Sequence, residues 1–189
     1  MRVFGIDPGS NRTGYGCVDT DGRRHQLVLC GAIRATDSGA FPERLATIYR
    51  ELSSIIRGCK PDVVGIESLF HATNVRSALK LGHARGVAML AATEAGIRVV
   101  EYTPAEIKRA IVGYGRAEKP QVQQMIKLLL RLDRIPEPHD AADALAVAIC
   151  HVHSVPSDAA AAAIARTRPP APATSRPAAP KSWRHYKPA

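Results

Sequence analysis

The chain lacks the features that would tie it to a membrane, a disulfide framework or a zinc site. Its 189 residues include only four cysteines, which are widely scattered and form no Cys-x-x-Cys pair. Such cysteines are typical of reduced, mostly buried thiols. No uninterrupted apolar stretch approaches the length of a membrane span, and the N-terminus lacks a signal-peptide pattern. We therefore expect a cytoplasmic protein with no membrane partner.

Length and charge limit the number of domains and the strength of any argument for a nucleic-acid ligand. The chain is long enough for one domain with a proper core and too short for two large lobes. Of the formal net charge of +9, the segment 155–189 carries +5 from six basic residues and one acid, which leaves +4 for residues 1–154. The expected folded part is therefore only mildly basic. Basic charge alone is weak evidence of nucleic-acid binding, because solvated lysine faces are common.

Apolar periodicity and turn residues predict an α/β protein. We expect an antiparallel meander of three strands over residues 2–7, 13–19 and 26–34. Helices should then alternate with two more strands: a helix after Pro42, a strand at 62–67, a helix at 74–95, a strand at 98–101, a helix from Thr103 to Gly113, a helix at 120–132 and a last helix from Asp140 past Cys150. This order predicts a five-stranded mixed sheet, with three antiparallel strands followed by two parallel ones, flanked by helices on both faces.

The composition changes abruptly near residue 154. From there on the chain consists largely of Ala, Pro, Arg and Ser. We therefore predict a domain over residues 1–153 followed by a disordered basic tail over 154–189. Trp183 and Tyr186 could stack on bases near the end of this tail. A solubilising tail and transient contact with nucleic acid are equally compatible with the sequence.

Four acidic residues stand where a backbone can hold them rigidly. Asp7 and Glu67 each end an apolar strand, and Asp140 and Asp143 lie three apart at the start of an Ala-rich helix. If the two strands pair in parallel, both acids reach the same edge of the sheet, where that helix could cap them. Hard oxygen ligands without nearby cysteine favour Mg²⁺ or Mn²⁺. Two ions about 3.5–4 Å apart could activate water and neutralise the leaving oxygen of a phosphodiester.

Each acid also has a simpler explanation. Asp7 before Pro-Gly could nucleate a turn, and Glu67 could form a salt bridge to an arginine. Asp140 and Asp143 could be first-turn acids favoured by the helix dipole. Taken one at a time these explanations compete well, but the topology brings the four groups together, which favours a shared site.

An ordered set of motifs resembles the RuvC family of Holliday-junction resolvases over residues 1–153. These are Gly-Ile-Asp-Pro-Gly-Ser-x-x-Thr-Gly-Tyr-Gly at 5–16, Ile66-Glu67, Asn74, Ser-Ala-Leu-Lys-Leu-Gly at 77–82, Ala-Arg-Gly-Val-Ala at 84–88, Val112-Gly113, Ala-Glu-Lys at 117–119 and Asp-Ala-Ala-Asp-Ala-Leu-Ala at 140–146. The resemblance implies an RNase H-like fold and a homodimer that nicks two opposed strands of a four-way DNA junction symmetrically. It further implies Mg²⁺ dependence, ligatable 5′-phosphate ends, and work in recombination and repair beside a junction-binding tetramer and a branch-migration motor.

The same resemblance suggests roles for individual residues. It implies that Asp7, Glu67 and Asp140 carry the catalytic metals, with Asp143 as the fourth acid. It favours Phe70 as a wedge between bases over a loop phenylalanine folded onto the core. It also assigns Lys108 and Lys119 to DNA contact, where isolated lysines would be read as solvated.

Five further positions are weaker candidates. Arg76 and Lys80, one helical turn apart, could extend a phosphate track, and His139 could assist near the metals. Gly82 and Gly86 cost a helix roughly 1 kcal/mol each relative to alanine, so they predict close approach to the sheet or, preferably, to a second copy.

Two other functions remain open from sequence alone. The Gly-Ile-Asp-x-Gly-Ser-x-x-Thr stretch also resembles the first phosphate loop of actin-like ATPases and sugar kinases. Those folds need two lobes and a second phosphate loop, which the chain lacks. The second alternative is a non-catalytic junction-binding module with vestigial acids, which the presence of all four acids disfavours.

Overall fold

The structure is a computed structural model that describes residues 1–35, 39–68 and 74–155. Its five strands form one sheet in the order β3-β2-β1-β4-β5. These strands are β1 (Arg2–Asp7), β2 (Arg12–Thr20), β3 (His25–Arg34), β4 (Val63–Glu67) and β5 (Arg98–Tyr102). Strands β1 to β3 pair antiparallel, whereas β4 and β5 run parallel to β1. The predicted five-stranded mixed sheet is confirmed, and β1 lies at its centre.

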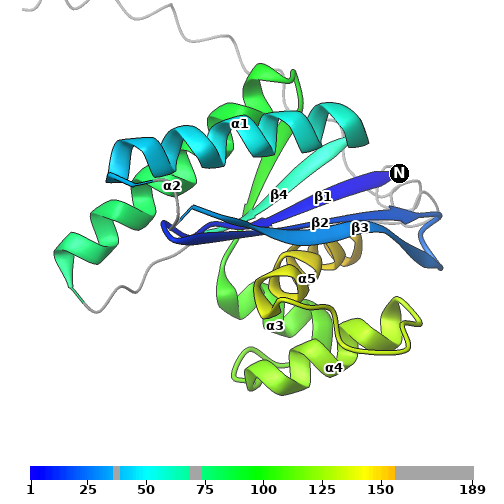
Figure 1. The fold of residues 1–189 in the computed structure, drawn as a ribbon. Helices are drawn as coiled ribbons and strands as arrows, with labels where there is room; N and C mark the ends of the chain where they lie inside the picture. The colour runs from blue at the N-terminus through cyan, green and yellow to red at the C-terminus, as the bar shows by residue number, and fades with distance from the viewer. Residues whose placement is uncertain (36–38, 69–73, 156–189) are drawn as a thin grey trace, which may run out of the picture. The chain divides into compact units, whose positions relative to one another are not determined.

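Helices cover both faces of the sheet (Figure 1). One face carries α1 (Phe41–Cys59) and α2 (Val75–Glu94). The other carries α5 (His139–Ser154), with α3 (Pro104–Val112) and α4 (Lys119–Leu129) packed against it. Within the described residues, none of these helices is long and apolar enough to cross a lipid bilayer.

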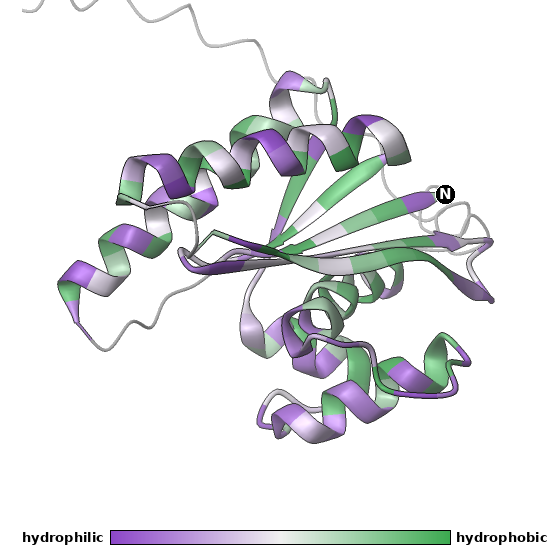
Figure 2. Cartoon of the chain, in the orientation of Figure 1, coloured by the Kyte–Doolittle hydropathy of each residue, from purple (hydrophilic) through white to green (hydrophobic). Residues whose placement is uncertain are grey.

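The central strand divides the core into two layers. Val3 belongs to the layer of α5, whereas Phe4 and Ile6 belong to the layer of α1 and α2. Hydrophobic residues dominate the middle of the sheet, whereas hydrophobic and hydrophilic residues alternate along the helices (Figure 2). Because side chains alternate along a strand, Gly5 and Asp7 lie on the same face as Val3. The face toward α5 is therefore the one that carries the acid at the end of β1.

The helix ends follow the sequence signals with one exception. Thr103 accepts a hydrogen bond from the Glu106 amide at 3.2 Å in a capping box, and Gly113 ends α3 with φ of 88°. The helix predicted over 120–132 ends earlier, at Leu129, and Arg131 takes a left-handed φ of 53°. No glycine or proline follows Leu129 directly, and Leu130 and Leu132 continue the helical pattern. The predicted helix was therefore too long.

Candidate active site

Glycines on three neighbouring strands let α5 lie directly on the sheet. A Cβ atom built on Gly5 would lie 2.0 Å from the Ala144 carbonyl oxygen, and one on Gly14 would lie 2.0 Å from that of Asp140. Cβ atoms on Gly16 and Gly65 would likewise crowd Leu145 and Val147. Side chains at these positions would push the helix away. The missing side chains therefore set how closely the N-terminus of α5 approaches the ends of β1 and β2.

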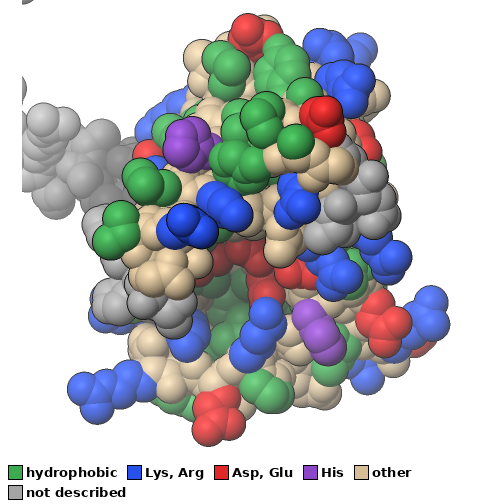
Figure 3. All heavy atoms as spheres, turned by 60° about the vertical axis from the view of Figure 1, so that its left-hand side comes forward, with side chains coloured by type: hydrophobic (Ala, Val, Ile, Leu, Met, Phe, Trp, Pro, Cys, Tyr) green, Lys and Arg blue, Asp and Glu red, His purple; other side chains and the backbone are tan. Residues whose placement is uncertain are grey.

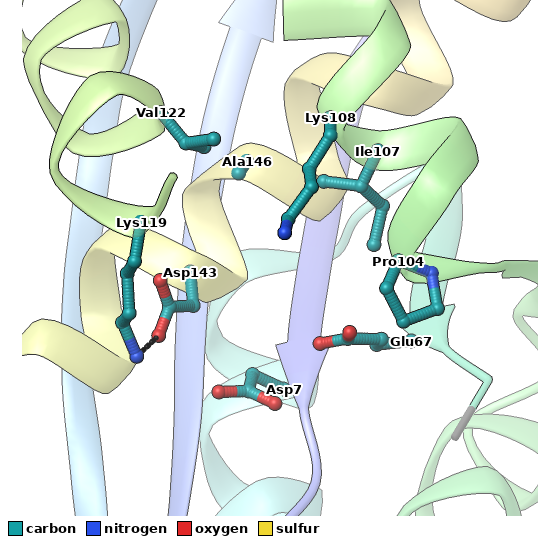
Figure 4. A pocket seen from close by; sticks show the side chains of 9 residues that line it. All are labelled: Asp7, Glu67, Pro104, Ile107, Lys108, Lys119, Val122, Asp143 and Ala146. Atoms are coloured by element: carbon teal, nitrogen blue, oxygen red, sulfur yellow. Dashed lines mark ion pairs between the residues drawn. The ribbon is translucent and has the colours of Figure 1, made fainter. Parts of the chain in front are cut away.

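Two acids reach the same edge of the sheet beneath this helix. Ile6 of β1 pairs with Ile66 of β4, so the next residues, Asp7 and Glu67, leave the sheet side by side. Each of these acids lies two residues after a glycine that faces α5. With Asp143 of α5 they line a cleft of about 350 Å³, whose wall is completed by Pro104, Ile107, Lys108, Lys119, Val122 and Ala146 (Figure 4).

The carboxylates in this cleft disturb one another electrostatically. Burial raises the pKa of Asp7 well above its ordinary value, and the negative charges of Glu67 and Asp143 raise it further. Burial also raises the pKa of Glu67, which is partly offset by a hydrogen bond shared with Asp7. The two neighbouring carboxyls thus disfavour each other's ionisation, as expected for like charges in a partly buried cleft.

Lysines from α3 and α4 reach into the same cleft. Lys119 forms an ion pair with Asp143, whose side chain is 18% exposed. Burial disfavours the charged form of Lys119, but the bond to Asp143 and the surrounding acids leave the pKa of Lys119 above its ordinary value. Lys108 comes near enough to lower the pKa of Glu67. The cleft therefore combines an acidic floor with long lysine side chains that reach in from α3 and α4.

Asp140 lies near this cluster but is turned away from the cleft. Its Oδ2 accepts a hydrogen bond from Arg12 Nη1 at 3.2 Å, and it does not line the cleft itself. Its charge still raises the pKa of Asp7. His139, the preceding residue, is exposed. The contact with Arg12 was not predicted from the sequence. The signal that could have indicated it is the position of Arg12 two residues before Gly14 on β2, which puts both residues on the same face of the sheet.

The donor set fits a divalent cation. All four acids offer hard oxygen atoms, and a cation would relieve the repulsion that raises the pKa of Asp7. Among the described residues, no three histidine, cysteine or acidic side chains are yet arranged as a ready metal-binding group. The contacts of Asp143 with Lys119 and of Asp140 with Arg12 show where two of the acids are directed instead.

Basic side chains surround the acidic floor. In the space-filling view, acidic side chains lie deep in a hollow whose rim carries Lys and Arg (Figure 3). This distribution suits a ligand with a negatively charged backbone whose reacting group must enter the hollow.

The remaining predicted residues lie elsewhere or cannot be placed. Arg76 and Lys80 are exposed on the first turns of α2, and neither lines the acidic cleft. The ammonium of Lys80 lies 5.7 Å from the ring centre of Phe41. Phe70 falls outside the described residues, so its predicted role as a wedge is untested.

Comparisons with known proteins agree on one family. A family model for "Crossover junction endodeoxyribonuclease RuvC" matches residues 3–151. The protein of that name from Koribacter versatilis is 54% identical over 155 residues, which span 82% of this chain and 93% of that protein. The structure of Thermus thermophilus RuvC aligns with a TM-score of 0.75 at 33% identity, over 81% of this chain and 94% of that one.

A second Thermus thermophilus structure, described as RuvC in complex with Holliday junction substrate, aligns with a TM-score of 0.74 at 30% identity. It covers 81% of this chain and 94% of that one. Because a family model matches residues 3–151 and a relative is 54% identical over 155 residues, this chain belongs to the RuvC family of crossover junction endodeoxyribonucleases.

Proposed function

We propose that this protein resolves four-way DNA junctions by metal-dependent, symmetrical nicking of two opposed strands, during homologous recombination and DNA repair. The observation that carries the proposal is the convergence of Asp7, Glu67 and Asp143 in one cleft rimmed by basic side chains. The cytoplasmic location expected from the sequence is part of this proposal. No specific observation favours either the nucleotide-binding alternative or the non-catalytic one.

The chemistry assigned to the cleft is hydrolysis of a phosphodiester. Two Mg²⁺ or Mn²⁺ ions bound by the four acids would supply an activated water and neutralise the leaving oxygen. Asp7 and Glu67 would form the floor of that site, and Asp143 and Asp140 would approach from α5. Cleavage that leaves a 5′-phosphate and a 3′-hydroxyl would give ends that a ligase can seal.

The lysines of the cleft have a separate part in this proposal. Lys119 and Lys108 reach the cleft from α4 and α3. If Asp143 held a cation, the Lys119 ammonium would be free to bind a phosphate oxygen or to stabilise negative charge in the transition state. Arg76 and Lys80 would extend the phosphate track along α2, and His139 would act beside Asp140.

The direct test uses a labelled synthetic four-way junction. We expect purified protein to nick two opposed strands at matching positions with Mg²⁺ and to leave the junction intact with a chelator. Mapping the nicks and sealing them with a ligase tests both the symmetry and the end chemistry. Tight ATP binding without any nicking would instead favour the nucleotide-binding alternative, and metal-independent binding without nicking would favour the non-catalytic one.

Junction binding should depend steeply on salt. Each phosphate neutralised by a lysine or arginine releases counterions, so the logarithm of affinity should fall linearly with the logarithm of salt concentration. We expect a loss of about 10³-fold or more between 50 and 200 mM salt if six or more phosphates are contacted. Fluorescence anisotropy with a labelled junction measures this slope. A flat dependence would contradict binding through the basic rim.

The exposed face of α2 supports the predicted homodimer. A shallow apolar groove on this helix is lined by Leu79, Gly82, Gly86 and Leu90, together with Ala78, His83 and Val87. Leu79 is 58% exposed and Leu90 is 49% exposed. Cβ atoms on Gly82 and Gly86 would meet nothing within 4 Å, so these glycines are not required by packing on the sheet. We infer that a second copy covers this groove, which gives the two active sites that paired nicks require.

A charged residue in this groove should therefore separate the dimer. We expect Leu79→Glu to raise the dimer dissociation constant at least about tenfold without lowering the melting temperature of the monomer, because burial of an unpaired charge is costly. Leu128→Glu is a matched control, since Leu128 on α4 is also 58% exposed. Sedimentation equilibrium of the three proteins measures the effect. Equal dissociation constants for both variants would remove the groove from the interface.

Two further proposals concern partners and the C-terminal segment. We propose that the dimer works with a junction-binding tetramer and a branch-migration motor. We also keep the proposal that residues 1–153 form the nuclease domain and that 154–189 form a disordered basic tail; residues from 156 on lie outside the described part of the chain.

A further inference from the structure

Two arginines face each other at one end of the β2–β3 pair. Arg12 of β2 and Arg34 of β3 are register partners, and both are exposed. Directly opposed residues in an antiparallel pair project on the same side with their side chains close together, and like charges there are destabilising. Such a pair is favourable when an anion lies between or above the two guanidinium groups.

The position of the pair relates it to the acidic cleft. Arg12 lies two residues before Gly14, and Gly14 faces the backbone of α5 at Asp140. Because side chains alternate along a strand, Arg12 and its partner Arg34 are on the α5 side of the sheet. They lie beside the N-terminus of α5, on the opposite side of β1 from Glu67.

Among the described residues, the only carboxylate that forms an ion pair with one of these two arginines is that of Asp140. Arg12 Nη1 donates to Asp140 Oδ2 at 3.2 Å, and the two side chains are 45% and 28% exposed. Asp140 is one of the acids proposed above to bind the cation. Arg12 and the cation would therefore compete for the same carboxylate.

We propose that Arg12 and Arg34 form a phosphate subsite for the DNA backbone next to the acidic cleft, and that Asp140 retains Arg12 until a divalent cation takes over its carboxylate. The inference rests on the proposed function. A guanidinium group binds phosphate in a bidentate manner, so two of them can hold one phosphate firmly. Arg12 thus exchanges its ion pair with Asp140 for a contact with a DNA phosphate.

The first test concerns the cation alone. In full-length protein without DNA, we expect Arg12→Gln to bind Mn²⁺ about twofold to fivefold more tightly than wild type, the scale of a partly exposed ion pair. Isothermal titration calorimetry gives the dissociation constants. Arg23→Gln is the matched control, because Arg23 is an exposed arginine in the turn at the far end of the same two strands. An affinity for Arg12→Gln equal to that of Arg23→Gln would overturn the competition.

The second test concerns DNA phosphate. The salt slope of junction binding should be measured with EDTA and with Ca²⁺, which takes the same oxygen ligands, in samples where the junction stays uncut. We expect Arg34→Gln to lower the slope by about one in both conditions. Arg12→Gln should leave the slope unchanged with EDTA and lower it by about one with Ca²⁺.

These outcomes separate this inference from the proposed function. If Arg12→Gln changes the slope equally in both conditions, or in neither, the exchange at Asp140 is wrong. If wild type nicks the junction while both arginine variants bind like Arg23→Gln, only the phosphate subsite is overturned. A wild-type protein that neither binds nor nicks the junction would overturn the proposed function and this subsite with it.

Discussion

Replacing Asp7 with asparagine is expected to abolish junction cleavage while leaving junction binding intact. Asp7 lies at the floor of the acidic cleft, beside Glu67 and Asp143. Loss of one electrostatic group at a reaction centre typically lowers the rate by about 10²–10³-fold, and loss of a shared metal ligand should exceed that. Single-turnover cleavage of a labelled junction measures the rate, and anisotropy measures binding. Cleavage at more than a tenth of the wild-type rate would exclude Asp7 from the metal site.

The same substitution should not weaken the metal-free protein. Burial and the charges of Glu67 and Asp143 raise the pKa of Asp7 in the folded state above its value of about 4 in the unfolded chain. The folded state therefore binds more protons, so wild type loses stability as pH rises from about 4 through the folded pKa. Asp7→Asn lacks this loss and should be equally or more stable at neutral pH.

Denaturation with urea at several pH values, in EDTA, checks this prediction. The difference between variant and wild type should grow as pH rises, and added Mg²⁺ should raise the melting temperature of wild type much more than that of the variant. Asp133→Asn is a suitable control, because Asp133 is an exposed acid that does not line the acidic cleft. A marked loss of stability in metal-free Asp7→Asn would show that Asp7 is structural.

Gly5→Ala is expected to destabilise the whole domain. Its Cβ would lie 2.0 Å from the Ala144 carbonyl oxygen and 2.8 Å from the Ala148 nitrogen. Both atoms are backbone atoms of a buried helix, so they cannot turn aside as a flexible side chain would. Overpacking of this kind costs about 3 kcal/mol or more. The free energy of unfolding, measured in urea, should fall accordingly, and cleavage should be lost even where the protein remains folded.

Gly58→Ala provides the matched control. Gly58 lies within α1, and a Cβ there would meet nothing within 4 Å. Alanine should therefore raise the stability by up to about 1 kcal/mol through its better helix propensity. Equal stabilities for Gly5→Ala and wild type would show that α5 can move away from the sheet without cost.

Much of the architecture was predictable because local signals agree with the topology. The apolar run before Asp7 predicts β1, and the capping box at Thr103 predicts the start of α3. The parallel pairing of the strands that end in Asp7 and Glu67 is confirmed. The end of α4 was missed, since the leucines continue the helical pattern while Arg131 adopts a left-handed conformation.

The site was less predictable where it depends on how α5 is placed. Its four acids were recognised as candidates, but their individual partners were not. The contacts of Asp140 with Arg12 and of Asp143 with Lys119 follow from the angle and height of α5 above the sheet. Gly5 of β1 and Gly14 and Gly16 of β2 carry that information, because each marks a point where α5 occupies the space of a side chain.

The two layers of the domain should consequently differ in how freely they can be redesigned. Between the sheet and α1 or α2, large interdigitating side chains such as Phe4 and Leu52 fill the space, and volume-conserving exchanges there can be absorbed by repacking. Beneath α5 there is less room for repacking at Gly5 and Gly14, where the main chain of the sheet packs directly against the main chain of the helix. Attempts to change the junction preference are best directed at α2, α3 and α4, while α5 and the glycines beneath it are left unchanged.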